Sequence, residues 1–140
     1  MTLRTLTAFI MLALMAIPAT LVYAQATPVG TGSTSLGTIL VDANGMTLYT
    51  FAPDSPNTST CSGACAGAWP PATVDAETAA LVQTGGAGMA EVGVFDRGDG
   101  MQLTWNGKPL YRFAPDSAPG QANGDGINGF GGLWNVVRVG

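Results

Sequence analysis

The two cysteines are the residues of this chain whose spacing points most directly to chemistry. Cys61 and Cys65 are its only cysteines, and three residues separate them. In an oxidising compartment, a pair this close in sequence is expected to form a disulfide. Because the loop that it closes is short, we expect a modest stabilisation, on the order of 2 kcal/mol. On this interpretation the bridge holds a loop rich in Gly and Ala against Trp69.

A redox pair or a copper(I) site is the alternative interpretation of the same cysteines. Thiolates and thioethers suit copper(I), and three methionines follow the N-terminal apolar stretch: Met46, Met89 and Met101. Many copper sites with this cysteine spacing also use histidine, and the chain has none. We therefore expect no bound metal and no cofactor.

The lack of histidine and the low charge exclude several classes of protein. Without histidine there is no Ser-His-Asp triad, no Cys-His dyad and no His-ligated zinc site. The 140 residues include five Lys or Arg and nine Asp or Glu, which gives a net charge of −4. This balance, without a basic cluster, argues against a nucleic-acid partner. We expect a single small domain with no catalytic constellation.

A twelve-residue segment that occurs twice reveals an internal repeat. Residues 44–55 read NGMTLYTFAPDS and residues 106–117 read NGKPLYRFAPDS, so nine of the twelve positions are identical. Similarity over this length indicates two divergent copies of one unit. We infer two repeats, at about 36–73 and 92–139.

The repeated segment carries aromatic and acidic residues that could form a site. They are Tyr49, Phe51, Asp54, Tyr111, Phe113 and Asp116. We expect the rings to lie in the core, with the carboxylates accepting hydrogen bonds from the tyrosine hydroxyls or from turn N–H groups. The alternative is a small-ligand or glycan groove on a pseudo-twofold axis, lined by the hydroxyls and both carboxylates. Paired carboxylates can hydrolyse glycosides, but nothing in the sequence brings the two together.

Two Asn-Gly pairs predict the β-hairpins that position these side chains. Asn-Gly favours a type I′ turn, in which both central residues have a positive φ. We expect such turns at Asn44-Gly45 and at Asn106-Gly107. Residues 101–105, before the second turn, alternate apolar and polar side chains, as is typical of a β-strand. The three tryptophans are expected to be packing residues: Trp69, Trp105 and Trp134.

Further short elements complete the predicted fold. We expect strands at 91–96 and 133–139, one helical turn at 78–82, and a long glycine-rich loop at 120–132. Several short strands between turn signals predict an all-β sandwich or small barrel, built from two pseudo-symmetric hairpin repeats.

Two short motifs lie in the predicted loops. The loop at 120–132 partly matches a calcium-binding pattern, and Asn123 and Asp125 are its candidate ligands. Its first and twelfth positions do not fit an EF-hand, so we expect a loop with polar turn residues. Residues 97–99 read Arg-Gly-Asp, which we interpret as a hairpin turn.

Residues 1–26 have the three-part layout of a secretory signal peptide. One positive charge, Arg4, precedes an apolar stretch at 8–17, and small residues follow at a cleavage site. The apolar stretch is short for a membrane span. We therefore expect cleavage after residue 26, a flexible leader at 27–35 rich in Gly, Ser and Thr, and a single β domain at 36–140.

Three segments match the motifs of a known family. Residues 49–54 (YTFAPD) and 111–116 (YRFAPD) fit the pattern Y-x-[FWY]-x-x-D, and residues 61–71 (CSGACAGAWPP) fit C-x-G-x-C-A followed by W-P-P. The chain resembles the bacterial secreted-repeat family, described as predicted lipoproteins with a Tyr-x-aromatic-x-x-Asp motif. The resemblance implies an exported protein and no particular activity, because the family has no established biochemical function. The chain lacks the N-terminal acylated cysteine of lipoprotein members, so membrane tethering is not expected.

These observations favour a structural or binding module over an enzyme. We expect an exported protein of the periplasm, the cell surface or the medium, whose partner belongs to the envelope or the extracellular space. No stable membrane insertion is expected once the signal peptide is removed. No particular partner, ligand or oligomeric state follows from the sequence.

Overall fold

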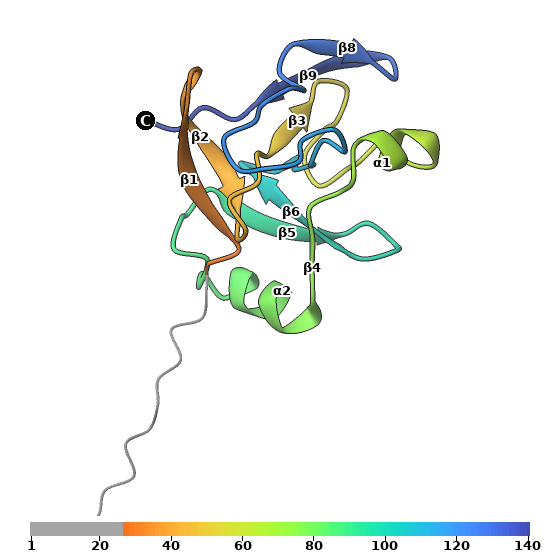
Figure 1. The fold of residues 1–140 in the computed structure, drawn as a ribbon. Helices are drawn as coiled ribbons and strands as arrows, with labels where there is room; N and C mark the ends of the chain where they lie inside the picture. The colour runs from red at the N-terminus through yellow and green to blue at the C-terminus, as the bar shows by residue number, and fades with distance from the viewer. Residues whose placement is uncertain (1–26) are drawn as a thin grey trace, which may run out of the picture.

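The computed structural model describes residues 27–140, which form an all-β domain with two short helices (Figure 1). The predicted signal peptide, residues 1–26, lies outside the described residues. The elements in chain order are β1 (Val29–Thr34), β2 (Gly37–Asp42), β3 (Tyr49–Phe51), α1 (Ala64–Ala68), β4 (Thr73–Val74), α2 (Ala76–Gln83), β5 (Val92–Asp96), β6 (Met101–Trp105), β7 (Lys108–Pro109), β8 (Ile127–Gly129) and β9 (Gly132–Val136). The predicted all-β fold class is confirmed.

An antiparallel hairpin opens each repeat. β1 pairs with β2 along six residues, and β5 pairs with β6 along five. The expectation of a flexible leader at 27–35 is therefore wrong for 29–34, which form β1, and Val29 is buried. The glycines of this segment allow two strands to pack closely, because a Cβ added at Gly32 would lie 3.0 Å from Val41 Cγ1.

The second Asn-Gly turn has the predicted geometry. Trp105 pairs with Lys108 across a loop of two residues. Asn106 has a φ of 49° and Gly107 a φ of 83°. Positive values at both central positions are those of a type I′ turn.

The first Asn-Gly turn differs from the prediction. Gly45 has a φ of 82°, whereas Asn44 does not have a positive φ. Asp42 N donates to Met46 O at 2.8 Å, so the loop holds three residues instead of two. The reason is the Asp42 carboxylate, whose Oδ1 accepts hydrogen bonds from Asn44 N and Met46 N. This side chain stabilises a longer loop in which only the glycine needs a left-handed conformation.

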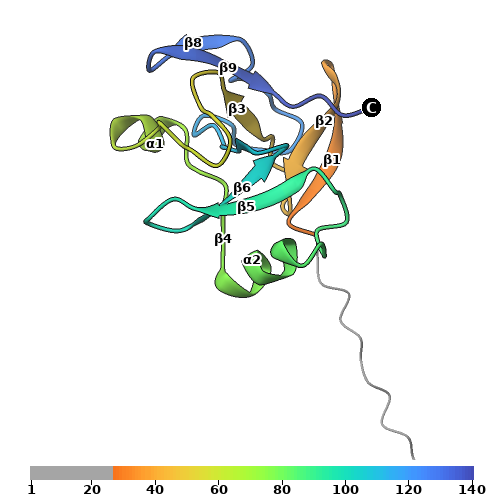
Figure 2. The same cartoon turned by 180° about the vertical axis from the view of Figure 1, so that it is seen from behind.

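The two repeats exchange their closing strands. β3 of the first repeat pairs with β9 of the second, and both views show the two strands side by side (Figures 1 and 2). β4, at the end of the first repeat, pairs with β6 of the second. In return, Leu40 N of β2 donates to Val137 O, and Val139 N donates to Thr38 O. Each repeat therefore completes the sheet of the other.

β6 is covered on both faces. It pairs with β4, β5 and β7, and Gln102, Leu103 and Thr104 are each no more than 2 % exposed. The alternating pattern of this segment predicts the strand correctly. It does not mark a solvent-facing side, because the side chains on both faces of the strand are buried.

The remaining elements modify the predicted loops. The segment 120–132, expected to be a long loop, contains β8, which forms a tight hairpin with β9. The predicted helical turn is α2, which begins after Asp75, whose carboxylate accepts a hydrogen bond from Thr78 N at 2.7 Å. Such an N-cap satisfies a free amide at the start of a helix. α1 was not predicted, and residues 97–99 form a turn between β5 and β6. No helix within the described residues is long and apolar enough to cross a membrane.

Two hydrophobic clusters form the core. The aliphatic cluster includes Leu40, Leu48, Leu103 and Leu110, and Trp105 packs against it. The aromatic cluster consists of Ile39, Val41, Tyr49, Phe51, Cys61, Cys65, Trp69, Tyr111, Trp134 and Val136, with Phe113 packed against it. The residues that could do chemistry therefore gather in the aromatic cluster.

Candidate functional site

The tyrosine of each repeat donates a hydrogen bond to the aspartate of the other repeat. Tyr49 Oη donates to Asp116 Oδ2 at 2.5 Å, and Tyr111 Oη donates to Asp54 Oδ2 at 2.5 Å. We call these two bonds the crossed Tyr–Asp pairs. The two tyrosines also exchange backbone hydrogen bonds, Tyr49 N to Tyr111 O at 2.8 Å and Tyr111 N to Tyr49 O at 2.9 Å. Because the tyrosines stand opposite each other, each side chain reaches the turn of the other repeat.

The second oxygen of each carboxylate is also occupied. Asp54 Oδ1 accepts hydrogen bonds from Thr60 N and Thr60 Oγ1 at 2.8 and 2.7 Å. Asp116 Oδ1 accepts them from Asn123 N and Nδ2 at 3.0 and 2.9 Å. Each carboxylate thus accepts three hydrogen bonds from the protein, and both are buried, at 5 % and 8 % exposure. Two carboxylates held in this way are not presented to a glycosidic bond.

The tyrosine hydroxyls are enclosed in the same networks. Tyr49 Oη accepts a hydrogen bond from Gly124 N, and Ser59 Oγ lies 2.6 Å from Tyr111 Oη. Burial, followed by the hydrogen bond to the partner carboxylate, raises the pKa of both Tyr49 and Tyr111 well above the ordinary value. Both residues are fully buried. The hydroxyls that a ligand groove on the axis would need are therefore inside the protein.

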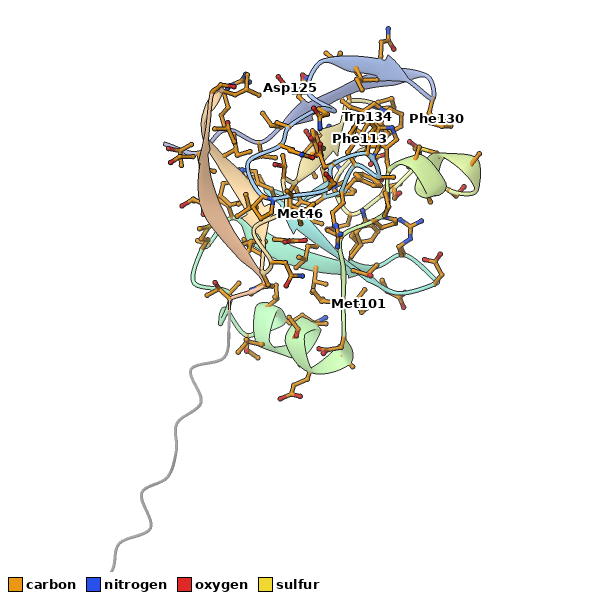
Figure 3. All side chains as sticks on the ribbon, in the orientation of Figure 1. Met46, Met101, Phe113, Asp125, Phe130 and Trp134 are labelled. Atoms are coloured by element: carbon orange, nitrogen blue, oxygen red, sulfur yellow. A yellow bond between two sulfur atoms is a disulfide. The ribbon has the colours of Figure 1, made fainter. Side chains whose placement is uncertain are left out.

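Four rings from the two repeats form one continuous stack. Trp69 and Trp134 lie face to face, with their ring centroids 4.0 Å apart and an angle of 3° between the planes. Phe113 continues the stack beyond Trp69, and Phe51 continues it beyond Trp134. Trp134 and Phe113 appear in the interior of the fold in Figure 3. Since each phenylalanine stacks on the tryptophan of the other repeat, the rings are exchanged as the strands are.

The cysteines form a disulfide at the edge of the aromatic cluster. Cys61 and Cys65 are bonded to each other, with their Cα atoms 5.3 Å apart. Both are buried, and Trp69 N donates to Cys65 O at 2.7 Å. The bridge therefore holds the start of α1 beside the stacked tryptophan.

Sequence reasoning missed the role of Arg97 and Gln102. The Arg97 side chain is only 7 % exposed and donates to Gln102 Oε1 at 2.8 Å and to Cys61 O at 3.1 Å. Gln102 Nε2 donates to Leu110 O at 2.8 Å. These bonds link the turn between β5 and β6 to the disulfide loop. The only signal in the sequence is a glutamine within a strand, which by itself predicts a solvent-facing residue.

The residues that favoured a copper site are dispersed. Met89 packs against the aliphatic cluster, whereas the cysteines belong to the aromatic cluster. Met46 and Met101 lie away from α1 in Figure 3. Within residues 27–140, no group of three or more His, Cys, Asp or Glu side chains is placed to hold a metal ion.

The calcium candidates take part in hydrogen bonds and ion pairs of the fold. Asn123 donates from its backbone and its side chain to Asp116. Asp125 Oδ1 accepts a hydrogen bond from Val136 N at 2.9 Å, and Oδ2 lies 3.8 Å from Arg138 Nη2. The loop therefore positions Asp116, the hydrogen-bond partner of Tyr49, and it also positions β9.

Comparison with known proteins agrees with the internal repeat. A family model described as "secreted repeat of unknown function" matches residues 30–73 and again residues 93–138. The two matches together cover more than half of the chain, and each contains one copy of the repeated segment. Neither a curated protein nor a solved structure matches this chain.

Proposed function

Because the chain belongs to a family of secreted repeats of unknown function, we propose that it is an exported, non-catalytic binding module. In this module the Tyr-x-Phe-x-x-Asp motif is the internal framework. Its partner is a component of the envelope or the extracellular space, not a nucleic acid. The observation that carries the proposal is the burial of both crossed Tyr–Asp pairs.

Burial argues against catalysis by these groups. A general acid or base must come within hydrogen-bond reach of its substrate. The hydroxyls of Tyr49 and Tyr111 are instead bonded to carboxylates that each accept two further hydrogen bonds from the protein. Breaking such a network leaves buried polar groups without partners, which costs about 1–3 kcal/mol for each group. The network therefore favours a fixed framework over a reactive site.

The disulfide supports the same proposal. Thiol–disulfide exchange requires a thiolate to reach a sulfur atom along an open approach. Cys61 and Cys65 are 1 % and 7 % exposed, and the loop between them is held by Arg97. A buried bridge of this kind fits a structural role better than a redox role.

Alkaline titration of tyrosine absorbance tests whether the motif is framework. Residues 27–140 contain two tyrosines, Tyr49 and Tyr111. A raised pKa means that the folded state holds its phenolic protons. Its contribution to stability is complete below the unfolded pKa of about 10 and is lost as the pH rises further. We expect no tyrosinate signal near pH 10 in the folded protein, and simultaneous ionisation of both residues when the protein unfolds.

Circular dichroism recorded on the same samples reports the unfolding independently. A tyrosine that ionises near pH 10 while the β-sheet signal is unchanged would show an accessible hydroxyl. That result would overturn the proposal that the motif is internal framework.

A further inference from the structure

A groove of about 420 Å³ lies between the loop after β2, the β4 segment, the start of α2 and Arg112 of the second repeat. Pro28 and Leu103 of β6 complete its lining. Buried apolar residues, Ala72 and Leu103, line it together with polar ones. The geometry points to a binding site for a small zwitterion that carries both an amine and a carboxylate, such as a free amino acid or a short peptide. The inference rests on the proposed binding function and gives it a location and a ligand class.

The arginine of the groove is only partly paired. Arg112 is 46 % exposed, and its Nη1 lies 3.6 Å from Asp42 Oδ2, which is too long for a hydrogen bond. Asp42 is held in place because its Oδ1 accepts two backbone hydrogen bonds. By contrast, Arg97 makes three polar contacts and is 7 % exposed. Unlike Arg97, the Arg112 guanidinium can therefore turn to bind a carboxylate in two-pronged geometry.

The charges of the groove do not belong to the repeated framework. By the repeat offset, Thr50 is the counterpart of Arg112 and Thr104 is the counterpart of Asp42. Arg112 occupies one of the three positions at which the twelve-residue segments differ. The third charged residue, Asp75, comes from the connection between the repeats. Asp42 and Asp75 also hold the loop after β2 and the start of α2. The Arg112 side chain, which replaces a threonine of the first repeat, is therefore the charge that fits a ligand role best.

The balance of charges selects the class of ligand. Asp42 and Asp75 line the groove together with a single guanidinium. The hydrogen bond from Thr78 N lowers the pKa of Asp75 and so favours its charged form. A simple anion would meet two carboxylates, and a simple amine would leave the guanidinium unused. A molecule with an amine and a carboxylate can pair with Asp42, Asp75 and Arg112 together. The volume of the groove lies at the small end of the range for ligand sites.

Titration of the ¹⁵N-labelled, disulfide-bonded mature protein with four small probes tests this inference. The probes are alanine, dialanine, N-acetylalanine and alaninamide, which separate free amino acid from peptide and remove each charge in turn. We expect saturable shifts of the amides at 42–46 and 73–78 with alanine or dialanine. Each blocked probe is expected to bind at least about tenfold more weakly, since it loses one charge-assisted contact. The tighter of the two unblocked probes identifies the source, free amino acid or peptide end.

Arg112→Thr is the decisive variant, because threonine is the residue at the equivalent position of the first repeat. We expect an unchanged Tm and binding weaker by at least about tenfold. Arg138→Thr is the matched control: Arg138 is 59 % exposed and lies 3.8 Å from Asp125, outside the groove. This variant should bind as the unmodified protein does.

Three results would overturn the inference. These are the lack of any saturable shift, equal binding of the blocked probes, and unchanged affinity in Arg112→Thr. None of them alters the tyrosine titration described above. Failure of the groove and failure of the framework proposal are therefore distinguishable.

Discussion

Arg97 and Gln102 show how single polar residues tie the two repeats together. Gln102 is fully buried, yet each end of its amide has a partner, Leu110 O on one side and Arg97 Nη1 on the other. Arg97 in turn reaches Cys61 O of the first repeat. A buried glutamine is stable only when its hydrogen bonds are satisfied. These two residues therefore connect β6 of the second repeat to the disulfide loop of the first repeat.

Gln102→Leu should destabilise the protein although it adds an apolar side chain to a buried strand. The change removes one of the two donors to Leu110 O, which keeps its hydrogen bond from Ala72 N, and removes one acceptor from the buried Arg97 guanidinium. We expect a loss of about 2 kcal/mol in the free energy of unfolding, since a hydrogen bond to a buried charged group is lost, measured by urea denaturation.

Asp99→Asn is the matched control at the other side of Arg97. Asp99 contacts Arg97 at 2.6 Å, but the aspartate itself is 77 % exposed, so water screens its charge. Asparagine also keeps a side-chain oxygen that can accept the hydrogen bond from Arg97. We expect a change below about 0.5 kcal/mol. A stable Gln102→Leu protein would show that the buried network contributes nothing.

At the scale of elements, the turn between β8 and β9 contains a side chain that does not suit it. Gly129 pairs with Gly132 across two residues. Phe130 has a φ of 55° and Gly131 a φ of 90°. Bulky side chains rarely adopt a positive φ, and Phe130 is 53 % exposed, so packing offsets little of this cost. Figure 3 shows Phe130 on this outer hairpin.

Phe130→Asn should stabilise the protein. Asn106 occupies the equivalent position of the other type I′ turn with a φ of 49°, and asparagine tolerates this conformation best after glycine. We expect a gain of about 1 kcal/mol, measured as a rise in Tm. Leu133→Asn is the control, because Leu133 is also exposed but does not have a positive φ. Destabilisation by Phe130→Asn would contradict the claim that the turn is strained.

The elements were predictable where local signals were strong. Asn106-Gly107, the alternation in β6 and the strand β5 follow from turn chemistry and periodicity. The same dipeptide at Asn44-Gly45 forms a different loop, because the Asp42 carboxylate bonds the turn amides. β1 was not predicted, because a segment rich in glycine is typical of a flexible loop. In the structure these glycines let β2 pack closely against β1. In both places a neighbouring segment decided the structure.

At the scale of the molecule, the interleaving of the repeats is the feature that the sequence could not predict. The repeat was evident from the sequence identity between residues 44–55 and 106–117. The same segments identified the aromatic and acidic residues of the core. Which tyrosine bonds which aspartate depends on contacts such as Tyr49 to Asp116, 67 positions apart. Local patterns contain no information on such a pairing. The groove was missed for the same reason, since its charges come from three separate segments.

Interleaving predicts that neither repeat folds alone. Fragments 27–85 and 86–140 divide the chain in the exposed connection after α2. Each fragment lacks the strands that pair with β3, β4 or β6, and each retains one tyrosine without its carboxylate partner. We expect both fragments to be unfolded by circular dichroism and to form a folded one-to-one complex when mixed. A fragment with native β-sheet signal on its own would contradict the exchange of strands.

The crossed Tyr–Asp pairs connect the two repeats at the centre of the molecule, and double-mutant cycles measure them most directly. Tyr49→Phe is combined with Asp116→Asn in one cycle and with Asp54→Asn in another, and the free energy of unfolding of every variant is determined. The structure predicts a coupling of about 1 kcal/mol or more between Tyr49 and Asp116, and close to none between Tyr49 and Asp54 of its own repeat. The reverse order, with coupling confined to Tyr49 and Asp54, would contradict the crossed arrangement.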